Sequence, residues 1–259
     1  MTAPDSTLDL TPAPGAAPFP RMVAAQAGAE IRAMLRNGEQ LLLTMIIPVL
    51  LLTGFSLAPL IDVGGGRRVD FLVPGVLALA VMSTAFTGQA IATGFERRYG
   101  VLKRLGATPL SRSGLMLAKT AAVVGVEIIQ AVIIVVVGLA LGWRPQGSFL
   151  GAALLIVLGT AAFSGLGLLM AGTLRAEATL AAANLVYLVL LGAGGVVFPL
   201  TKFPEAVRPF LEALPISALT GGLRAVLAEG AALPLVPLAV LAVWAVLSLG
   251  LVSRTFRWE

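Results

Sequence analysis

The chain has no cysteine and no histidine, and only 12% of its 259 residues are charged. Disulfides, thiol or histidine catalysis and the usual zinc sites are therefore excluded. No paired acids or acid–base cluster faces a common level, so neither a catalytic residue nor a metal ligand is predicted. The sequence also lacks the G-x-x-x-x-G-K-[ST] loop that holds nucleotide phosphates. We therefore do not expect this chain to be an enzyme or to bind a cofactor of its own.

Apolar residues dominate what is present: they make up 58% of the chain, and the mean hydropathy is +0.97. The charged fraction is about half that of a soluble domain. The chain is therefore predicted to be an all-α integral membrane protein in a lipid bilayer. Its net charge of +5 does not indicate nucleic-acid binding, because the basic residues flank apolar runs, where they orient membrane segments.

The first 20 residues are rich in Pro, Ala and Thr and have neither the basic start nor the apolar run of a signal peptide. We interpret residues 1–20 as a disordered cytoplasmic tail and residues 21–259 as a single transmembrane domain. Residues 21–40 have apolar side chains at helical spacing, which favours an interfacial helix along the inner leaflet over an ordinary solvated helix.

Six apolar segments follow, each close to or above the roughly 20 residues that cross a bilayer. Their approximate bounds are 41–60, 71–95, 118–141, 149–174, 178–199 and 233–252. Placing both termini in the cytoplasm puts 12 Lys and Arg residues inside and 6 outside. The excess of basic residues inside predicts a multi-pass protein with both termini cytoplasmic.

The loop between the second and third segments, residues 96–119, holds six of the eighteen basic residues. Helical spacing from Arg97 to Leu105 places basic side chains on one arc and apolar ones on the other. Thr108-Pro109 then ends the helix, and Ser111 is placed to cap the next one. This pattern is typical of a short helix at the membrane surface or in a groove on a partner.

Residues 200–232 are interrupted by prolines and cannot form one spanning helix. We predict a re-entrant hairpin of two short helices bent at Pro215, half entering the outer leaflet. Its buried side chains are predicted to be Phe203, Phe210, Leu211, Leu214 and Ile216. Broken backbone at membrane depth needs cover from protein or water, so this hairpin is the candidate outer gate, with Pro199, Phe203, Pro204 and Pro215 as its residues.

Glu127 is the one charged residue deep inside a predicted span, and Gln130 lies about one helical turn further on. Inserting an ionisable side chain at the centre of a membrane helix costs roughly 2.5–3.5 kcal/mol of free energy, so such a residue is by default a functional candidate. Two interpretations stay open. In the first, Glu127 and Gln130 line a translocation path or bind a cation. In the second, Glu127 is protonated and joins two helices by a hydrogen bond.

Small residues recur four apart in the fourth segment, at Ala161 with Gly165 and at Gly167 with Ala171. This spacing allows helix backbones to approach closely. It fits packing inside one subunit and a seam between two subunits equally well.

Two patches of the sequence resemble one family, the type-2 ABC exporter permeases, and are closest in character to drug and antibiotic efflux permeases. The first patch comprises Glu96-Arg97, Gly100, Leu105, the step Thr108-Pro109-Leu110-Ser111, and Lys119. The second comprises Phe198-Pro199, Phe203-Pro204, Leu214-Pro215 and Leu223-Arg224.

The resemblance implies a six-helix subunit of a prokaryotic plasma (inner) membrane. Such a subunit pairs with a second permease copy, identical or related, and is driven by separate ATP-binding subunits that carry ATP and Mg. These partners grip a coupling helix between spans two and three. The residues expected to dock them are Glu96, Arg97, Arg98, Tyr99, Gly100, Leu102, Lys103, Arg104, Leu105 and Pro109.

Three functional hypotheses follow. The first is the permease of an ATP-driven exporter, the second an ion-coupled secondary carrier that uses Glu127, and the third an intramembrane enzyme of lipid metabolism. Aromatic residues make up only 6% of the chain, which leaves few platforms for stacking sugars. An amphipathic drug, natural product or lipid is therefore favoured as substrate over a long sugar chain.

Overall fold

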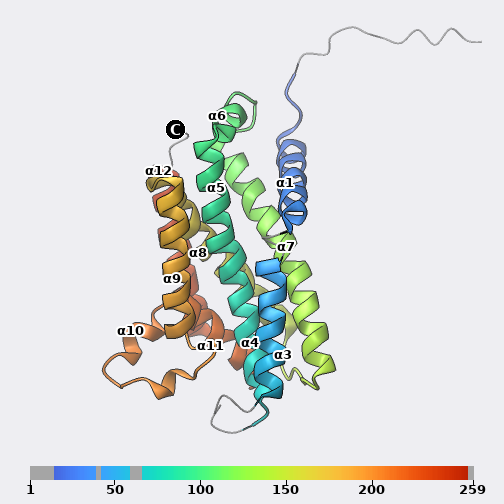
Figure 1. The fold of residues 1–259 in the computed structure, drawn as a ribbon, viewed down its shortest axis with the longest axis vertical. Coiled ribbons are helices and arrows are strands. Elements are labelled where there is room, and N and C mark those ends of the chain that lie inside the picture. The colour runs from blue at the N-terminus through green and yellow to red at the C-terminus, as the bar shows by residue number, and fades with distance from the viewer. Residues whose placement is uncertain (1–14, 39–41, 59–65, 256–259) are drawn as a thin grey trace, which may run out of the picture.

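The computed structural model describes residues 15–38, 42–58 and 66–255, and these parts of the chain are helical with no strand (Figure 1). The α-helices are α1 (Phe19–Arg36), α3 (Ile47–Leu57), α4 (Arg68–Val81), α5 (Gln89–Arg98), α6 (Val101–Gly106), α7 (Arg112–Ala140), α8 (Phe149–Thr173), α9 (Ala176–Ala193), α10 (Arg208–Glu212), α11 (Pro215–Leu227) and α12 (Leu235–Thr255). Two π-helical segments, η1 (Leu42–Ile46) and η2 (Met82–Gly88), and a 3₁₀ turn, η3 (Leu200–Lys202), complete them.

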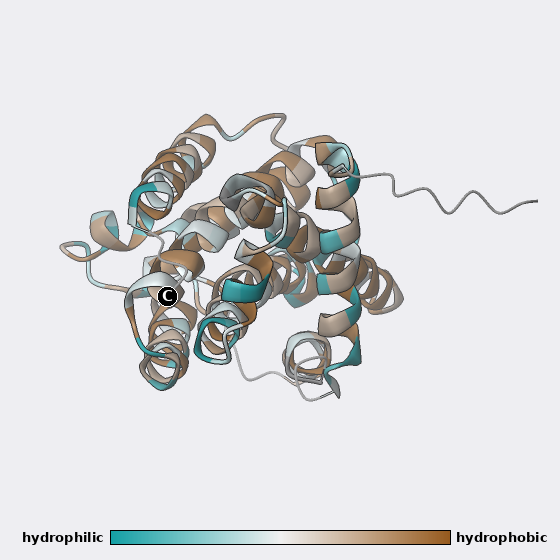
Figure 2. Cartoon of the chain, turned by 90° about the horizontal axis from the view of Figure 1, so that it is seen from above, coloured by the Kyte–Doolittle hydropathy of each residue, from teal (hydrophilic) through white to brown (hydrophobic). Residues whose placement is uncertain are grey.

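Within the described residues, five helices are long and apolar enough to cross a bilayer, which confirms the prediction of an all-α membrane protein. They are Arg68–Arg98, Ser113–Ala140, Phe149–Thr173, Ala176–Ala193 and Leu235–Thr255. A shorter apolar helix, Thr44–Leu57, lies within the predicted first span, and both ends of that prediction fall outside the described residues. Seen from above, much of the outer surface of the bundle carries hydrophobic residues (Figure 2).

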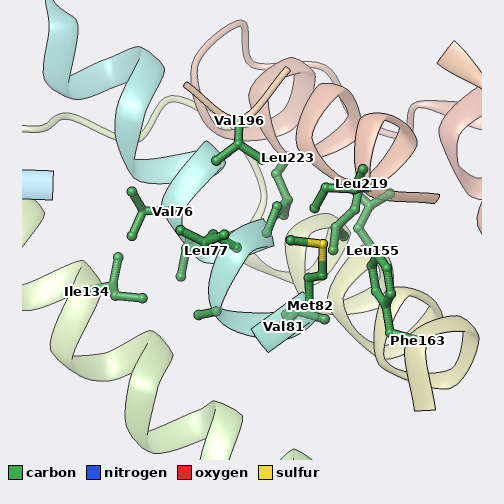
Figure 3. Packing of buried hydrophobic residues seen from close by; sticks show 14 of the residues in the cluster. Val76, Leu77, Val81, Met82, Ile134, Leu155, Phe163, Val196, Leu219 and Leu223 are labelled. Atoms are coloured by element: carbon green, nitrogen blue, oxygen red, sulfur yellow. The ribbon is translucent and has the colours of Figure 1, made fainter. Parts of the chain in front are cut away.

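The second span is one rod built from α4, η2 and α5, and it forms the centre of the fold. Every residue of α4 from Leu72 to Val81 is buried, because α3, α7, α8 and α11 all pack around it. Figure 3 shows Val76, Leu77 and Met82 of this rod against side chains of α7, α8 and α11. The π-helical turns of η2 were not predicted, since its residues have the same apolar character as the helices on either side.

Helix α1 packs along α7 (Figure 1), with Val23 buried at the contact. It begins at Phe19, two residues before the predicted helix. Residues 1–14 of the predicted tail lie outside the described residues.

The segment between α9 and α12 turns into the bundle at Ala213 and comes back out along α11. The Trp244 indole Nε1 donates to the Ala213 carbonyl at 2.9 Å, although Trp244 lies nine residues into α12, roughly 14 Å along that helix. The return ends where the Gln146 N–H donates to the Leu227 carbonyl at 3.0 Å, in the loop between α7 and α8. This path fits the predicted re-entrant hairpin bent at Pro215.

One part of the hairpin prediction is wrong. Phe210 was expected to be buried, but its side chain is 74% exposed, whereas Ile216 is fully buried. No residue of α10 is buried, so the core contacts of this segment come from α11.

Candidate functional site

The loop between α5 and α7 has a break at Gly100. Gly100 has φ of +69°, a conformation that glycine adopts without the strain other residues suffer. The single helix predicted from Arg97 to Leu105 is therefore wrong: α5 ends at Arg98 and α6 starts at Val101. The predicted cap is present, because the Ser111 Oγ accepts from the Gly114 N–H at 3.1 Å.

Helix α6 is held to the bundle by a small apolar cluster. Leu102 is fully buried and packs in one cluster with Val23 of α1 and with Leu110 and Leu115. Leu105 is half-buried against the same cluster. Of the docking candidates in this loop, Leu102 therefore faces the protein interior, which fixes the orientation of α6.

The side chains that α6 and its flanks present to the outside are mostly polar. Tyr99 is 64% exposed, and Lys103, Arg104 and Pro109 are exposed as well. The Arg104 Nη2 donates to the Tyr99 carbonyl at 3.4 Å, so the guanidinium stays close to the turn. These side chains form the exposed surface of the loop between α5 and α7.

Arg97 and Arg98 point instead toward the turn between α8 and α9. The Arg97 Nη1 donates to the Gly172 carbonyl at 2.7 Å, and its Nη2 donates to the Leu174 carbonyl. Arg98 forms an ion pair with Glu177 of α9. Both arginines thus connect the end of the second span to the turn between two others.

A buried charge cluster lies behind α6, where α1, α5 and α7 meet. The Lys119 Nζ lies 2.6 Å from the Glu96 Oε2 and 3.0 Å from the Glu30 Oε1, and the Lys119 side chain is only 5% exposed. Gln26 donates to the same Glu30 oxygen at 2.9 Å. Glu96 therefore lies inside the bundle, bound to a lysine of the same chain.

Glu127 and Gln130 are both buried and both hydrogen-bonded to neighbouring helices. The Thr160 hydroxyl of α8 donates to the Glu127 Oε2 at 2.5 Å. Gln130 accepts from the Thr84 hydroxyl at 2.9 Å and donates to the Thr44 carbonyl at 2.8 Å. Gln130 thus connects α7 to both π-helical segments, η2 and η1.

A cavity of about 750 Å³ lies beside these residues, between the short apolar helix Thr44–Leu57, the second span and α9. Its lining residues are Asn37, Thr44, Ile47, Ser83, Thr87, Gly88, Ile91, Ala92, Phe95, Leu180, Asn184 and Tyr187. They combine hydroxyl, amide and phenol groups with apolar side chains, and none of these described lining residues carries a formal charge. The volume is within the roughly 300–1,000 Å³ of small-molecule sites.

The sequence did not reveal these cavity residues. Neutral polar side chains such as Thr87 and Asn184 occur throughout helical membrane bundles, where they hydrogen-bond to neighbouring backbone. Neither Glu127 nor Gln130 lines the cavity, although Gln130 bonds the backbone of Thr44, which does.

Arg224 of α11 joins three segments at the end of the bundle opposite α6. Its guanidinium donates to the carbonyls of Gly195 (2.6 Å), Val196 (2.9 Å) and Phe71 (3.2 Å) and lies 3.5 Å from the centre of the Phe71 ring. Gly75 makes room for this contact, since a Cβ there would lie 2.6 Å from the Val196 carbonyl oxygen. The sequence placed Arg224 in the second patch of the family resemblance and among the external basic residues, but it did not predict these contacts.

The four predicted gate residues differ in burial. Pro199 precedes η3, Phe203 is half-buried and Pro204 is exposed. Pro215 is buried at the first turn of α11, where a missing N–H leaves no hydrogen bond unmade.

The small residues of α8 pack inside the subunit. A Cβ on Gly165 would lie 2.1 Å from the Ser248 Oγ of α12, and one on Gly167 would lie 2.8 Å from the Phe86 carbonyl of η2. These contacts favour the first of the two interpretations given to the small-residue spacing.

Comparison with known proteins agrees with this architecture. Residues 24–228 match the family model described as ABC-2 type transporter, which covers most of α1, the shorter apolar helix Thr44–Leu57, the first four of the five long apolar helices and the re-entrant segment. A search of the curated proteins found no match. Because the family model covers well over half of the chain, and because the chain is a helical membrane protein, it belongs to the ABC-2 type transporter family as a permease.

Proposed function

We propose that this chain is the membrane-spanning subunit of an ATP-driven exporter. A separate ATP-binding subunit, which carries ATP and Mg, docks on α6, and a second permease copy, identical or related, completes the transporter. In the proposed orientation α6 and both termini face the cytoplasm of a prokaryotic cell. The observation that carries the proposal is the uncharged, mixed polar and apolar cavity walled by η2 and α5, the rod that leads directly to α6.

The lining of the cavity sets the class of substrate. Because the described part of the wall holds no formal charge, an ion gains little there. Its hydroxyl and amide groups offer hydrogen bonds to a neutral polar part, and Ile91, Phe95 and Leu180 contact an apolar part. An amphipathic drug, natural product or lipid meets both conditions. Glu127 and Gln130 then act from outside the cavity, holding α7 to α8 and to the two π-helical segments.

The docking surface within the predicted set is Tyr99, Lys103, Arg104 and Pro109. Glu96, Arg97, Arg98, Gly100, Leu102 and Leu105 act through the fold, because their contacts fix where that surface lies. Closure of the ATP-binding subunits moves α6, and the attached α5 and α7 carry the change toward the cavity.

The docking surface is tested in inverted vesicles that contain the complex with its ATP-binding subunit. We expect Arg104→Glu to abolish ATP-dependent uptake of a fluorescent amphipathic compound while the subunit still inserts. Arg32→Glu is the matched control, because it makes the same charge change at an exposed site on α1. Normal transport by the Arg104 variant would refute the docking surface.

The cavity is tested by filling it. Thr87→Phe places a ring among the lining residues and should reduce compound-stimulated ATP hydrolysis, while basal hydrolysis continues. Transport with a pH gradient alone, and none with ATP, would instead support an ion-coupled carrier and contradict the proposed function.

A further inference from the structure

A second cavity, of about 420 Å³, opens between α9 and α12 over α8. Its walls include Phe86, Leu166, Met170, Val186, Leu190 and Trp244. The two side-chain polar groups in the wall already have partners within the chain: the Thr173 hydroxyl donates to the Leu169 carbonyl at 2.9 Å, and the Trp244 indole to Ala213. The side chains of the wall therefore offer no hydrogen bond to a guest, which must be hydrocarbon where it lies inside.

This cleft is separate from the proposed export cavity. In η2, Phe86 lines the cleft and its neighbour Thr87 lines the cavity. In α9, Val186 lines the cleft and its neighbour Tyr187 lines the cavity. Segments η2 and α9 thus form the wall between the two spaces. A guest of the cleft contacts the outer side of this wall.

Two exposed arginines lie at the α6 end of the cleft. Leu174 lines the cleft and is followed by Arg175. Arg254 is exposed near the end of α12, which lies at the same end of the bundle as α6 (Figure 1). Because Gly165 meets Ser248 and the two helices run in the same direction, Arg254 comes level with Ala171, two residues before α8 ends.

We propose that the cleft binds one anionic phospholipid, with its headgroup phosphate at Arg175 and Arg254 and an acyl chain between α9 and α12. Most of the lining belongs to membrane-spanning helices, Leu174 directly follows α8, and Leu214 and Pro215 belong to the re-entrant segment, so the medium next to the opening is acyl chain. An empty apolar space forfeits dispersion contacts that a chain restores. Anionic lipids concentrate on the cytoplasmic leaflet, which the proposed orientation places at this end, and juxtamembrane Lys and Arg attract them.

Trp244 reports on this site directly because it lies in the wall. The chain has three tryptophans, so Trp143→Phe with Trp258→Phe leaves Trp244 as the one fluorophore. The subunit is reconstituted in phosphatidylcholine nanodiscs with increasing fractions of brominated phosphatidylglycerol or brominated phosphatidylcholine. Bromine quenches tryptophan only at close range, so the quenching curve measures occupancy of the cleft.

We expect brominated phosphatidylglycerol to quench at a markedly lower fraction than brominated phosphatidylcholine. Arg175→Gln and Arg254→Gln should each weaken that preference about fivefold, the effect of one basic residue at an anionic surface. Val186→Phe fills the cleft and should remove the preference. Val189→Phe is the matched control, because Val189 is 58% exposed on the same helix and does not line the cleft.

Equal quenching by the two lipids would show only the general lipid shell and overturn the proposal. Loss of the preference in Val189→Phe as well as in Val186→Phe would do the same. Absence of quenching by either lipid would show that protein covers the cleft, a second permease copy being one such cover. None of these results depends on ATP or on export, so they leave the proposed function to its own tests.

Discussion

Arg224 should hold the end of the bundle opposite α6 together, and its removal has a measurable cost. Arg224→Leu removes three hydrogen bonds, to the carbonyls of Phe71, Gly195 and Val196. Hydrogen bonds in membrane proteins average about 0.6 kcal/mol, which gives roughly 2 kcal/mol for three. A buried carbonyl left without a donor costs about 1–3 kcal/mol. Since water can reach carbonyls near the end of a span once the side chain is gone, we expect a loss of about 2–4 kcal/mol.

The assay is unfolding of the purified subunit in mixed micelles as the fraction of dodecyl sulfate rises, followed by tryptophan fluorescence. Arg224→Lys should recover only part of the loss, because an ammonium is a compact charge and cannot span three acceptors as a guanidinium does. Arg208→Leu is the matched control. Arg208 donates only to carbonyls within its own loop, those of Thr201 and Phe203, so its loss should be below about 1 kcal/mol.

The reasoning would be refuted if the free energies of unfolding of Arg224→Leu and Arg208→Leu differed by less than about 0.5 kcal/mol, because surface substitutions that break no structural contact usually change stability by no more than that. The same variant should also transport poorly, because α11 would no longer be fixed to the second span. Normal stability with impaired transport would move Arg224 from a structural role to one in the transport cycle.

Three further predictions concern the same architecture. Gly75→Ala should destabilise the subunit by about 1–3 kcal/mol in the micelle assay, because the added methyl group overpacks against the Val196 carbonyl. A single cysteine at position 106 should be protected from an impermeant maleimide in intact cells, and one at position 206 should be labelled. Glu127→Gln should leave ATP-driven transport and stability nearly unchanged, because an amide oxygen still accepts from Thr160, while Glu127→Leu should cost about 0.6 kcal/mol.

Each of these has a contradicting outcome. Gly192→Ala is the control for the glycine test, because a Cβ there meets nothing within 4 Å; equal stability of the two variants would contradict the close approach at Gly75. Labelling at position 106 in intact cells would reverse the proposed orientation. A strong transport defect in Glu127→Gln would support the interpretation in which the Glu127 carboxyl lines the substrate path.

The predictable part of this fold rested on apolar run length and on local rules. Five long spans and the Ser111 cap follow from these signals, because each depends on residues close in sequence. The break at Gly100 was also encoded locally, since glycine before a short amphipathic stretch permits a left-handed turn. The break was not predicted because the amphipathic spacing continues across it, from Arg97 to Leu105.

The remaining features depend on contacts between distant residues. Arg224 reaches Phe71 across 153 positions, and Lys119 joins Glu30 and Glu96 from different helices. Nothing in the composition of either region marks these pairs. The cavity was likewise hidden, because its lining comes from segments far apart in the sequence and its described residues include no charged side chain.

The buried charge cluster at Lys119 has a mechanical consequence. The ion pairs of Lys119 with Glu30 and Glu96 join α7 to α1 and α5 next to α6. These parts of the three helices would therefore move together with α6 as one rigid unit. The second span would then bend at η2, the segment next to α5 where the regular α-helical hydrogen-bond pattern is interrupted by π-helical turns. A bend of roughly 10° there would swing the far end of α5 by about 2.6 Å, over the roughly 15 Å that its ten residues span. Because η2 is also part of the wall between the cavity and the cleft, a bend there would change the shape of both spaces at once.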